Sequence, residues 1–175
     1  MLRGIRSTIT LIFLCALLAG AAFWGWDAAM KPLPEAEDLP LCEDEPVEVG
    51  QKVYPDQVTV SVYNASSRTG LAGRTAQLFL DEGFAEGQDG NAPRGTTVAY
   101  AQIWTSDPLS PAVRLVKSFL GPRASVVEGE QLGLGVVVVV GEGFEELVRG
   151  KKSATTKQAG FICSPPGSSD EQPVS

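Results

Sequence analysis

The stretch VTVSVYNASSRTGLAGRTAQLFLDEGF, residues 58–84, decides how this chain folds. At its start, valine alternates with polar or aromatic residues, so that Val58, Val60 and Val62 fall on every second position. This period of two predicts a half-buried strand. The small polar residues from Asn64 to Thr69 then predict a loop.

A helix is predicted directly after this loop. Leu71, Thr75 and Leu78 follow one another at intervals of four and three residues, which places them on one helical face. Gly83 suits the helix end, because glycine adopts a left-handed backbone without steric cost. Strand, loop and helix together form the first half of a βαβ-type unit.

Residues 84–149 continue the pattern of strands and helices. Five consecutive valines at 136–140 predict a strand buried on both faces, which belongs in the middle of a sheet. Ser110 and Pro111 are typical of a helix start, and Gly121-Pro122 of its end. The remaining predictions are a short strand at 84–88, a strand at 96–104, an edge strand at 124–127 and a helical turn at 142–149.

The resulting order, β-α-β-β-α-β-β, predicts an α+β fold. Two helices on one face of a small mixed sheet form a two-layer sandwich. Right-handed crossovers place the first and last long strands together at the centre. We therefore expect a ferredoxin-like split βαβ arrangement for this part of the chain.

The N-terminal residues 1–31 predict a cytoplasmic stub and one transmembrane helix. An apolar run at 9–26 follows Arg3 and Arg6, and its length of about 18 residues is the lower end of what spans a bilayer. Positive residues favour the cytoplasmic side, so the rest of the chain is expected outside the cell membrane. The alternative is a signal peptide cleaved near Ala19-Gly20-Ala21.

Residues 32–55 predict an acidic, proline-rich linker that stays extended. Five prolines fall between 31 and 56, and seven acids fall between 32 and 50 without any Lys or Arg. The other 14 acids equal the 14 basic residues of the chain in number, so the net charge of -7 comes from the linker. A neutral domain argues against nucleic acid as a partner, because phosphate binding needs clustered Lys and Arg.

Two of the three cysteines fall on the expected outer side of the membrane. Cys42 lies in the linker and Cys163 near the C-terminus, and disulfides persist in that compartment. We hypothesise that they form a disulfide; the alternative is free or intermolecular thiols. With no histidine in the chain, two thiols are too few ligands for zinc, so no metal site is predicted.

The stretch at 58–84 also resembles the opening motif of the LytR C-terminal domain family. The family pattern is a valine-rich strand, Asn-Gly-Ser/Thr, a Gly-Leu-Ala helix start and a closing Gly-Phe. Ala65 departs from it, because glycine is usual there. The resemblance covers roughly residues 56–142, within a predicted domain at 56–148. The matching residues are Val60, Val62, Asn64, Ser66, Gly70, Leu71, Ala72, Arg74, Ala76, Gly83 and Phe84.

The resemblance implies a role in the bacterial cell envelope. Domains of this family follow LytR–CpsA–Psr phosphotransferases, or stand alone behind a membrane anchor, especially in actinobacteria. The stand-alone form resembles envelope-integrity proteins that assist attachment of polymers to peptidoglycan. Cell-wall polymer, peptidoglycan and LytR–CpsA–Psr ligases are therefore the expected partners.

Catalytic machinery is not apparent in the sequence. The chain has no histidine, the commonest general base, and no Gly-x-Ser-x-Gly nucleophile elbow. Gly133-Leu134-Gly135 precedes a strand rather than a helix, so it is not a dinucleotide-binding loop. We expect neither an enzyme nor a cofactor.

The loop and helix start at 64–74 are the candidate ligand site. Unpaired N–H groups at a helix start attract anions, and two arginines lie nearby in sequence. The alternative is structural: Asn64 and Ser66 satisfy the loop's own backbone, and Gly70 permits its bend. The candidate ligand-binding residues are Asn64, Ser66, Arg68, Thr69, Gly70 and Arg74.

The C-terminal residues 149–175 predict a basic and then disordered tail. Its basic residues, Arg149, Lys151, Lys152 and Lys157, have no acid among them and could contact anionic wall polymers or the acidic linker. Two functions follow: a non-catalytic membrane-tethered scaffold that binds wall polymer, or an extracytoplasmic protein–protein interaction module without glycan binding.

Overall fold

The computed structural model describes residues 13–21 and 42–166. The chain divides into two compact units, residues 1–38 and 39–175. In the first unit, residues 13–21 are helical and exposed. In the parts of the chain that are described, no helix has the length and apolar character needed to cross a bilayer. Half of the anchor predicted at 9–26 lies outside those parts.

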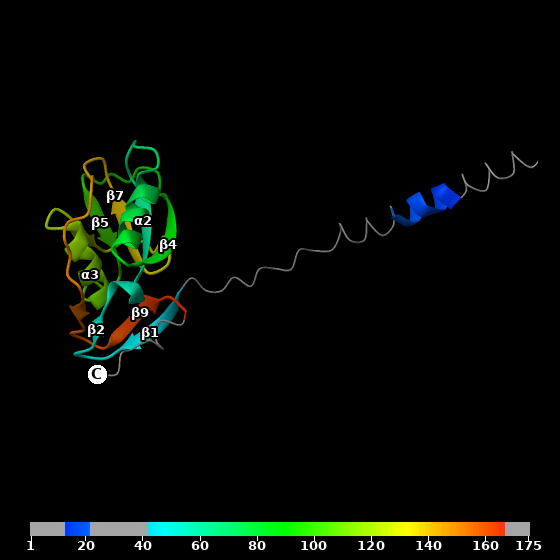
Figure 1. The fold of residues 1–175 in the computed structure, drawn as a ribbon. Coiled ribbons are helices and arrows are strands. Elements are labelled where there is room, and N and C mark those ends of the chain that lie inside the picture. Colours follow the sequence, from blue (N-terminus) through cyan, green and yellow to red (C-terminus); the bar gives the residue numbers. More distant parts are fainter. Residues whose placement is uncertain (1–12, 22–41, 167–175) are drawn as a thin grey trace, which may run out of the picture. The chain divides into compact units, whose positions relative to one another are not determined.

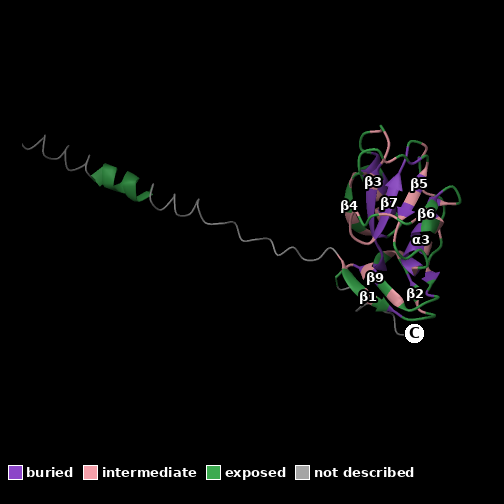
Figure 2. Cartoon of the chain, turned by 180° about the vertical axis from the view of Figure 1, so that it is seen from behind, coloured by how far each residue is buried: buried purple, intermediate pink, exposed green. Residues whose placement is uncertain are grey.

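The second unit is built on a five-stranded sheet (Figure 2). Its strands, in spatial order, are β4 (Ala85–Asn91), β3 (Thr59–Asn64), β7 (Val136–Val140), β5 (Ala101–Trp104) and β6 (Ser125–Val127). The valine strand β7 is the middle strand and is buried along its whole length. It pairs in parallel with β3 and antiparallel with β5. The predicted central strand and its pairing with the first long strand are confirmed.

Both helices, α2 (Leu71–Asp81) and α3 (Pro111–Leu120), pack on one face of this sheet (Figure 1). Each helix connects two neighbouring parallel strands, β3 to β4 and β5 to β6. The pair β3–β4 runs antiparallel to the pair β5–β6. In each pair, the second strand lies nearer its own edge of the sheet, and the two edges are opposite ones. Right-handed crossovers consequently leave both helices on the same side. The two-layer α+β prediction is confirmed for this sheet.

The split βαβ arrangement was wrong. In that arrangement a third strand separates the two strands that a helix connects, whereas here β3 pairs directly with β4, and β5 with β6. The last strand, β7, lies between the two βαβ units rather than inside one of them. Its apolar side chains alternate to both faces, so the middle of the sheet is the position that removes all of them from water.

The two faces of the sheet are covered differently. Val136, Val138 and Val140 join the main core under the helices, whereas Val137 and Val139 join a smaller cluster on the opposite face. That second face is covered by loop residues, including Ala92 and Leu132. Residues 96–100 do not form part of the predicted strand: Val98 joins this smaller cluster, whereas Tyr100 packs against the main core. Residues 142–149 form no helical turn.

The prediction that residues 32–55 form an extended linker was also wrong for the described residues 42–55, and the C-terminal segment contains two strands that were not predicted. Strand β1 (Glu43–Val47) pairs with β9 (Gly160–Ser164), and β2 (Lys52–Val53) with β8 (Ala154–Thr155), both antiparallel. A short 3-10 turn, η1 (Pro55–Gln57), leads into β3. Figure 1 shows these pairs at one end of the domain. Residues 32–41 and 167–175, which complete the predicted linker and tail, lie outside the described residues.

The disulfide between Cys42 and Cys163 is present, as predicted. It joins residues separated by 121 positions, and their Cα atoms lie 5.3 Å apart. The register places Cys163 opposite Asp44, so the bond closes the start of β1 onto the end of β9. Cys15 is free and exposed.

Candidate functional site

The loop predicted as a ligand site lies where β3 and β7 end. These strands are parallel and in register from Val60 to Asn64, so the loop after β3 meets residues 141–144 after β7. Gly141 lies against a third segment, because a Cβ there would collide with the backbone of Val98. The predicted site is therefore a junction of two loops.

Asn64 and Ser66 satisfy the backbone of their own loop. The Asn64 side chain accepts a hydrogen bond from the Ser66 N–H at 2.9 Å and donates one to the Arg68 carbonyl at 2.8 Å. The Ser66 hydroxyl accepts a bond from the Arg68 N–H at 3.1 Å. Gly70 has a φ of 73°, a left-handed value that favours glycine. These contacts agree with the structural alternative, and a ligand-binding role for the three residues stays a prediction.

The loop also holds an anion, which is a carboxylate of the chain itself. The Glu142 side chain accepts a hydrogen bond from the Ser67 N–H at 3.1 Å and one from the Ser67 hydroxyl at 3.2 Å. Backbone N–H groups in tight loops favour such an acceptor. An external anion would have to displace Glu142 to use this donor.

Arg68 links the two loops and is not a free cation. Its Nη1 donates to the Glu142 carbonyl at 3.2 Å and also to the Phe144 carbonyl. Phe144 is fully buried, so the guanidinium fixes the chain at the point where it enters the core. By contrast, Thr69 and Arg74 are exposed at the start of α2. Their predicted role in ligand binding stays a prediction.

Replacing Arg68 by alanine is expected to lower the free energy of unfolding by about 1–3 kcal/mol, because two carbonyls lose a charged donor. Arg68→Lys should restore part of this stability, because both bonds come from one nitrogen, Nη1, and an ammonium nitrogen also carries several donors. Denaturant unfolding of the three proteins measures the difference. A lysine variant no more stable than the alanine variant would contradict the role assigned to these two bonds.

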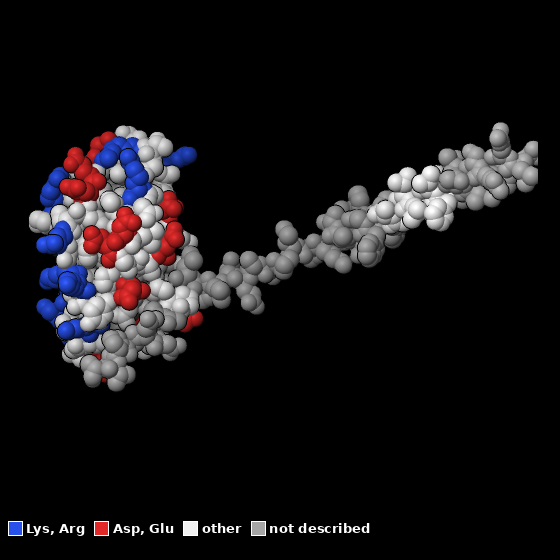
Figure 3. Space-filling model, viewed as in Figure 1, with Lys and Arg blue, Asp and Glu red and all other residues white. Residues whose placement is uncertain are grey.

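A strip of basic side chains lies along α3 and the segment that follows β7. The backbone N–H of Lys151 donates to the Ser118 hydroxyl at 2.9 Å, and the Arg114 guanidinium donates to the Thr155 carbonyl. These contacts place the basic tail residues beside α3, and Figure 3 shows the blue side chains gathered along that edge. We define the basic strip as Lys52, Arg114, Lys117, Arg149, Lys151, Lys152 and Lys157.

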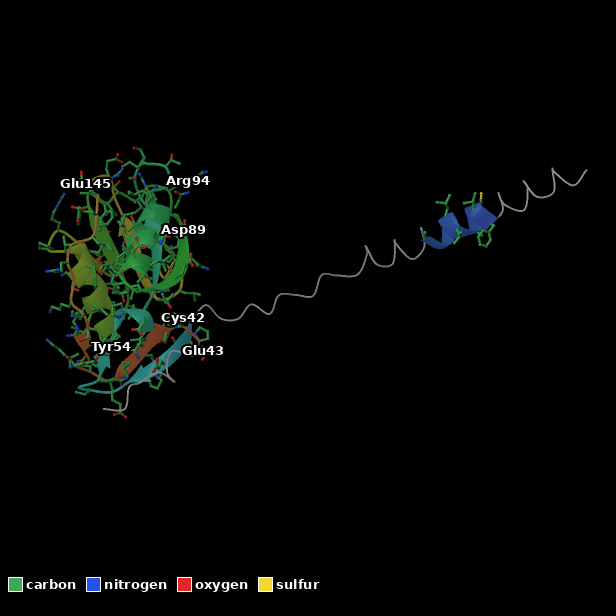
Figure 4. The ribbon with its side chains drawn as sticks, viewed as in Figure 1. Cys42, Glu43, Tyr54, Asp89, Arg94 and Glu145 are labelled. Atoms are coloured by element: carbon green, nitrogen blue, oxygen red, sulfur yellow. A yellow bond between two sulfur atoms is a disulfide. The ribbon has the colours of Figure 1, made fainter. Side chains whose placement is uncertain are left out.

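A cleft of about 500 Å³ opens beside the disulfide. Its walls come from β1, β9, the loop after β5, the first turn of α3 and the loop before β7. Both cysteines line it, together with Asp44, Asp107 and Phe161. Figure 4 shows Cys42 and Glu43 at the end of the domain opposite Glu145 and Arg94, so the cleft and the loop junction are separate.

The loop before β7 is fixed to the sheet behind it. The Tyr63 hydroxyl donates to the Leu132 carbonyl and the Ser61 hydroxyl to the Leu134 carbonyl, each at 2.6 Å. Burial, and then the charge of Asp89, raises the pKa of Tyr63, which favours the neutral form that donates this bond. Gly133 has no room for a side chain, because a Cβ there would meet the Tyr63 hydroxyl.

Comparison with known proteins identifies the family. Residues 57–144, which include the loop junction and all five strands of the sheet, match the family model LytR_C, described as the LytR cell envelope-related transcriptional attenuator. The chain belongs to the LytR_C family. The disulfide and the strand pairs β1–β9 and β2–β8 lie outside the matched residues and flank the LytR_C domain on both sides.

One solved structure is similar to this LytR_C chain. It is the soluble domain of a conserved hypothetical secreted protein from Mycobacterium marinum, with 24% sequence identity and a TM-score of 0.48. The similarity covers 63% of this chain and 78% of that chain. No curated protein matches the chain.

Two groups of residues in these sites were not predicted from the sequence. Glu142 and Phe144 complete the loop junction, although Gly141-Glu142-Gly143 is a visible signal of a tight approach after a buried strand. Asp44, Phe161 and the two cysteines form one side of the cleft from segments predicted as linker and tail. In the described residues, no group of three His, Cys, Asp or Glu side chains is placed to hold a metal ion.

Proposed function

We propose that this chain is a non-catalytic, membrane-tethered scaffold of the bacterial envelope that binds an anionic wall polymer. The basic strip is the observation that carries the proposal. It gathers cations from α3, β2 and residues 149–157, so one continuous edge presents positive charge although the chain as a whole carries a net charge of -7. Phosphate-bearing polymers are the envelope components that such an edge attracts.

The location in the envelope has two supports. The family description refers to the cell envelope, and the disulfide suits an oxidising compartment outside the cytoplasm. The apolar run at 9–26 after two arginines supports a single-pass anchor with the domain outside. LytR–CpsA–Psr ligases are the candidate protein partners, and a protein–protein module without glycan binding is the second candidate function.

Charge reversal of the strip tests the polymer proposal. The full chain in detergent is expected to bind sacculi that carry phosphate-bearing polymers, and this binding should weaken as salt increases. Lys151→Glu with Lys152→Glu should weaken binding at least about tenfold, because each basic side chain near an anionic surface contributes roughly 1 kcal/mol. Sacculi stripped of phosphate polymers should bind weakly.

The matched control changes the same amount of charge elsewhere. Arg74→Glu with Arg94→Glu alters two exposed arginines outside the strip and should leave binding unchanged. This control also tests the loop site predicted from the sequence, in which Arg74 contacts the ligand. Equal losses of sacculus binding in both double variants would reject the basic strip as the binding surface. A loss in the control alone would assign binding to the start of α2.

A further inference from the structure

The cleft beside the disulfide is a second candidate binding site, and its chemistry differs from that of the basic strip. Its volume of about 500 Å³ falls within the roughly 300–1,000 Å³ typical of small-ligand sites. Its lining combines carboxylates, hydroxyls and an amide with one large aromatic side chain. Neither Lys nor Arg is among the lining residues, so the cleft does not suit an anion.

Phe161 is the most unusual residue of this lining. It lies in β9, yet 67% of its surface is exposed, which is rare for a large aromatic side chain in a strand. In the antiparallel register, Phe161 lies opposite Pro46 and Cys163 opposite Asp44, so these residues share one face of the β1–β9 pair. An aromatic ring and a carboxylate therefore face the cleft together, next to the disulfide.

The opposite side of the cleft supplies further polar groups. Asp107 fixes the loop after β5, because one of its carboxylate oxygens accepts the Leu109 N–H at 3.1 Å. Ser106 and Ser110 add hydroxyl groups to the same wall. The Gln131 side chain donates to the Gly133 and Gly135 carbonyls at 2.6 and 2.9 Å, which stiffens the third wall.

We propose that this cleft binds an uncharged saccharide chain. Sugar hydroxyls donate hydrogen bonds to carboxylates and accept them from serine hydroxyls, while the apolar C–H face of a sugar ring packs on an exposed aromatic ring. Such a pocket needs few but well-placed polar groups around an apolar contact. This proposal rests on the proposed envelope function in one respect: the envelope is taken as the source of the saccharide.

One wall of this cleft comes from the two flanking segments that the disulfide joins. β1 and β9 lie outside the residues that match the family model, and the bond between Cys42 and Cys163 holds them together at the cleft. Reduction should free the start of β1 and remove the wall that carries Asp44. Saccharide binding is therefore expected only in the oxidised protein.

Calorimetry with the full chain in detergent tests the proposal, with a neutral N-acetylglucosamine oligomer as the probe. We expect binding whose affinity is the same at low and high salt, because no ion pair forms. Phe161→Ala should weaken it at least about tenfold. The matched control is Tyr54→Ala, which removes an aromatic ring that is 45% exposed outside the cleft and should leave the affinity unchanged.

The outcomes separate this site from the strip. The double variant Lys151→Glu with Lys152→Glu should bind the oligomer normally, and Phe161→Ala should keep the salt-dependent part of its binding to phosphate-bearing sacculi. Absence of oligomer binding, equal binding by Phe161→Ala, or an affinity that falls steeply with salt would each overturn the saccharide site. Retained binding after reduction, with the thiols confirmed by alkylation, would overturn the role of the disulfide.

Discussion

Removal of the disulfide is expected to lower the free energy of unfolding by about 4–5 kcal/mol, a large share of a domain's usual stability. The bond joins residues separated by 121 positions, and a loop of that length restricts the unfolded chain strongly. The strand β1 itself contributes little burial to the pair. β1 carries three acidic residues, and only Val47 of its five residues is buried.

Replacing Cys42 and Cys163 together by serine provides the measurement, with denaturant unfolding followed by circular dichroism. Cys15→Ser is the control, because Cys15 is free and exposed and its loss should leave the unfolding midpoint unchanged. Hydrogen exchange should show the largest loss of protection in β1 and β9. A double variant with a loss below about 1 kcal/mol would show that backbone pairing alone holds these strands.

The core of the fold was predictable because its signals are local. The alternation of Val58, Val60 and Val62 and the five valines at 136–140 each define a strand without reference to the rest of the chain. The strand order was not predictable in the same way. Whether β7 enters a βαβ unit or lies between two of them depends on pairing between distant segments, and both orders bury the same valines.

The strands β1 and β9 were not predicted, for a related reason. The acids and prolines around Cys42 favour an extended chain, and the residues around Cys163 are surrounded by serine, proline and glycine. Each segment becomes a strand by pairing with the other, and the disulfide joins the two. The cysteine count predicts the bond, but it does not predict the two strands that the bond joins.

The candidate site shows the same limit. The sequence indicated free donors in the loop and helix start at 64–74, and the structure shows three loop N–H groups, those of Ser66, Ser67 and Arg68, bonded to the side chains of Asn64, Glu142 and Ser66. An anion site read from one segment cannot reveal an acceptor that comes from a segment 75 positions away. The basic tail residues were visible, but their alignment with Arg114 and Lys117 of α3 requires the fold.

Replacing Phe84 by alanine is expected to lower the free energy of unfolding by about 3–5 kcal/mol, because Phe84 connects the cores under the two helices. It is 3% exposed, and its ring lies between those of Phe79 at 5.3 Å and Phe119 at 5.0 Å, both edge to face. Such ring pairs add roughly 0.5–1.5 kcal/mol each beyond burial.

The backbone at this position is set by the helix end that the sequence predicted. Gly83 has a φ of 89°, and the Phe84 N–H then donates to the Phe79 carbonyl at 3.0 Å, so the turn delivers the ring into the core. Denaturant unfolding of Phe84→Ala and Phe84→Leu measures the cavity and ring contributions. Phe161→Ala is the matched control, since that ring is 67% exposed and its removal should cost less than about 0.5 kcal/mol. Equal losses at the buried and the exposed phenylalanine would contradict the assignment of Phe84 as the link between α2 and α3.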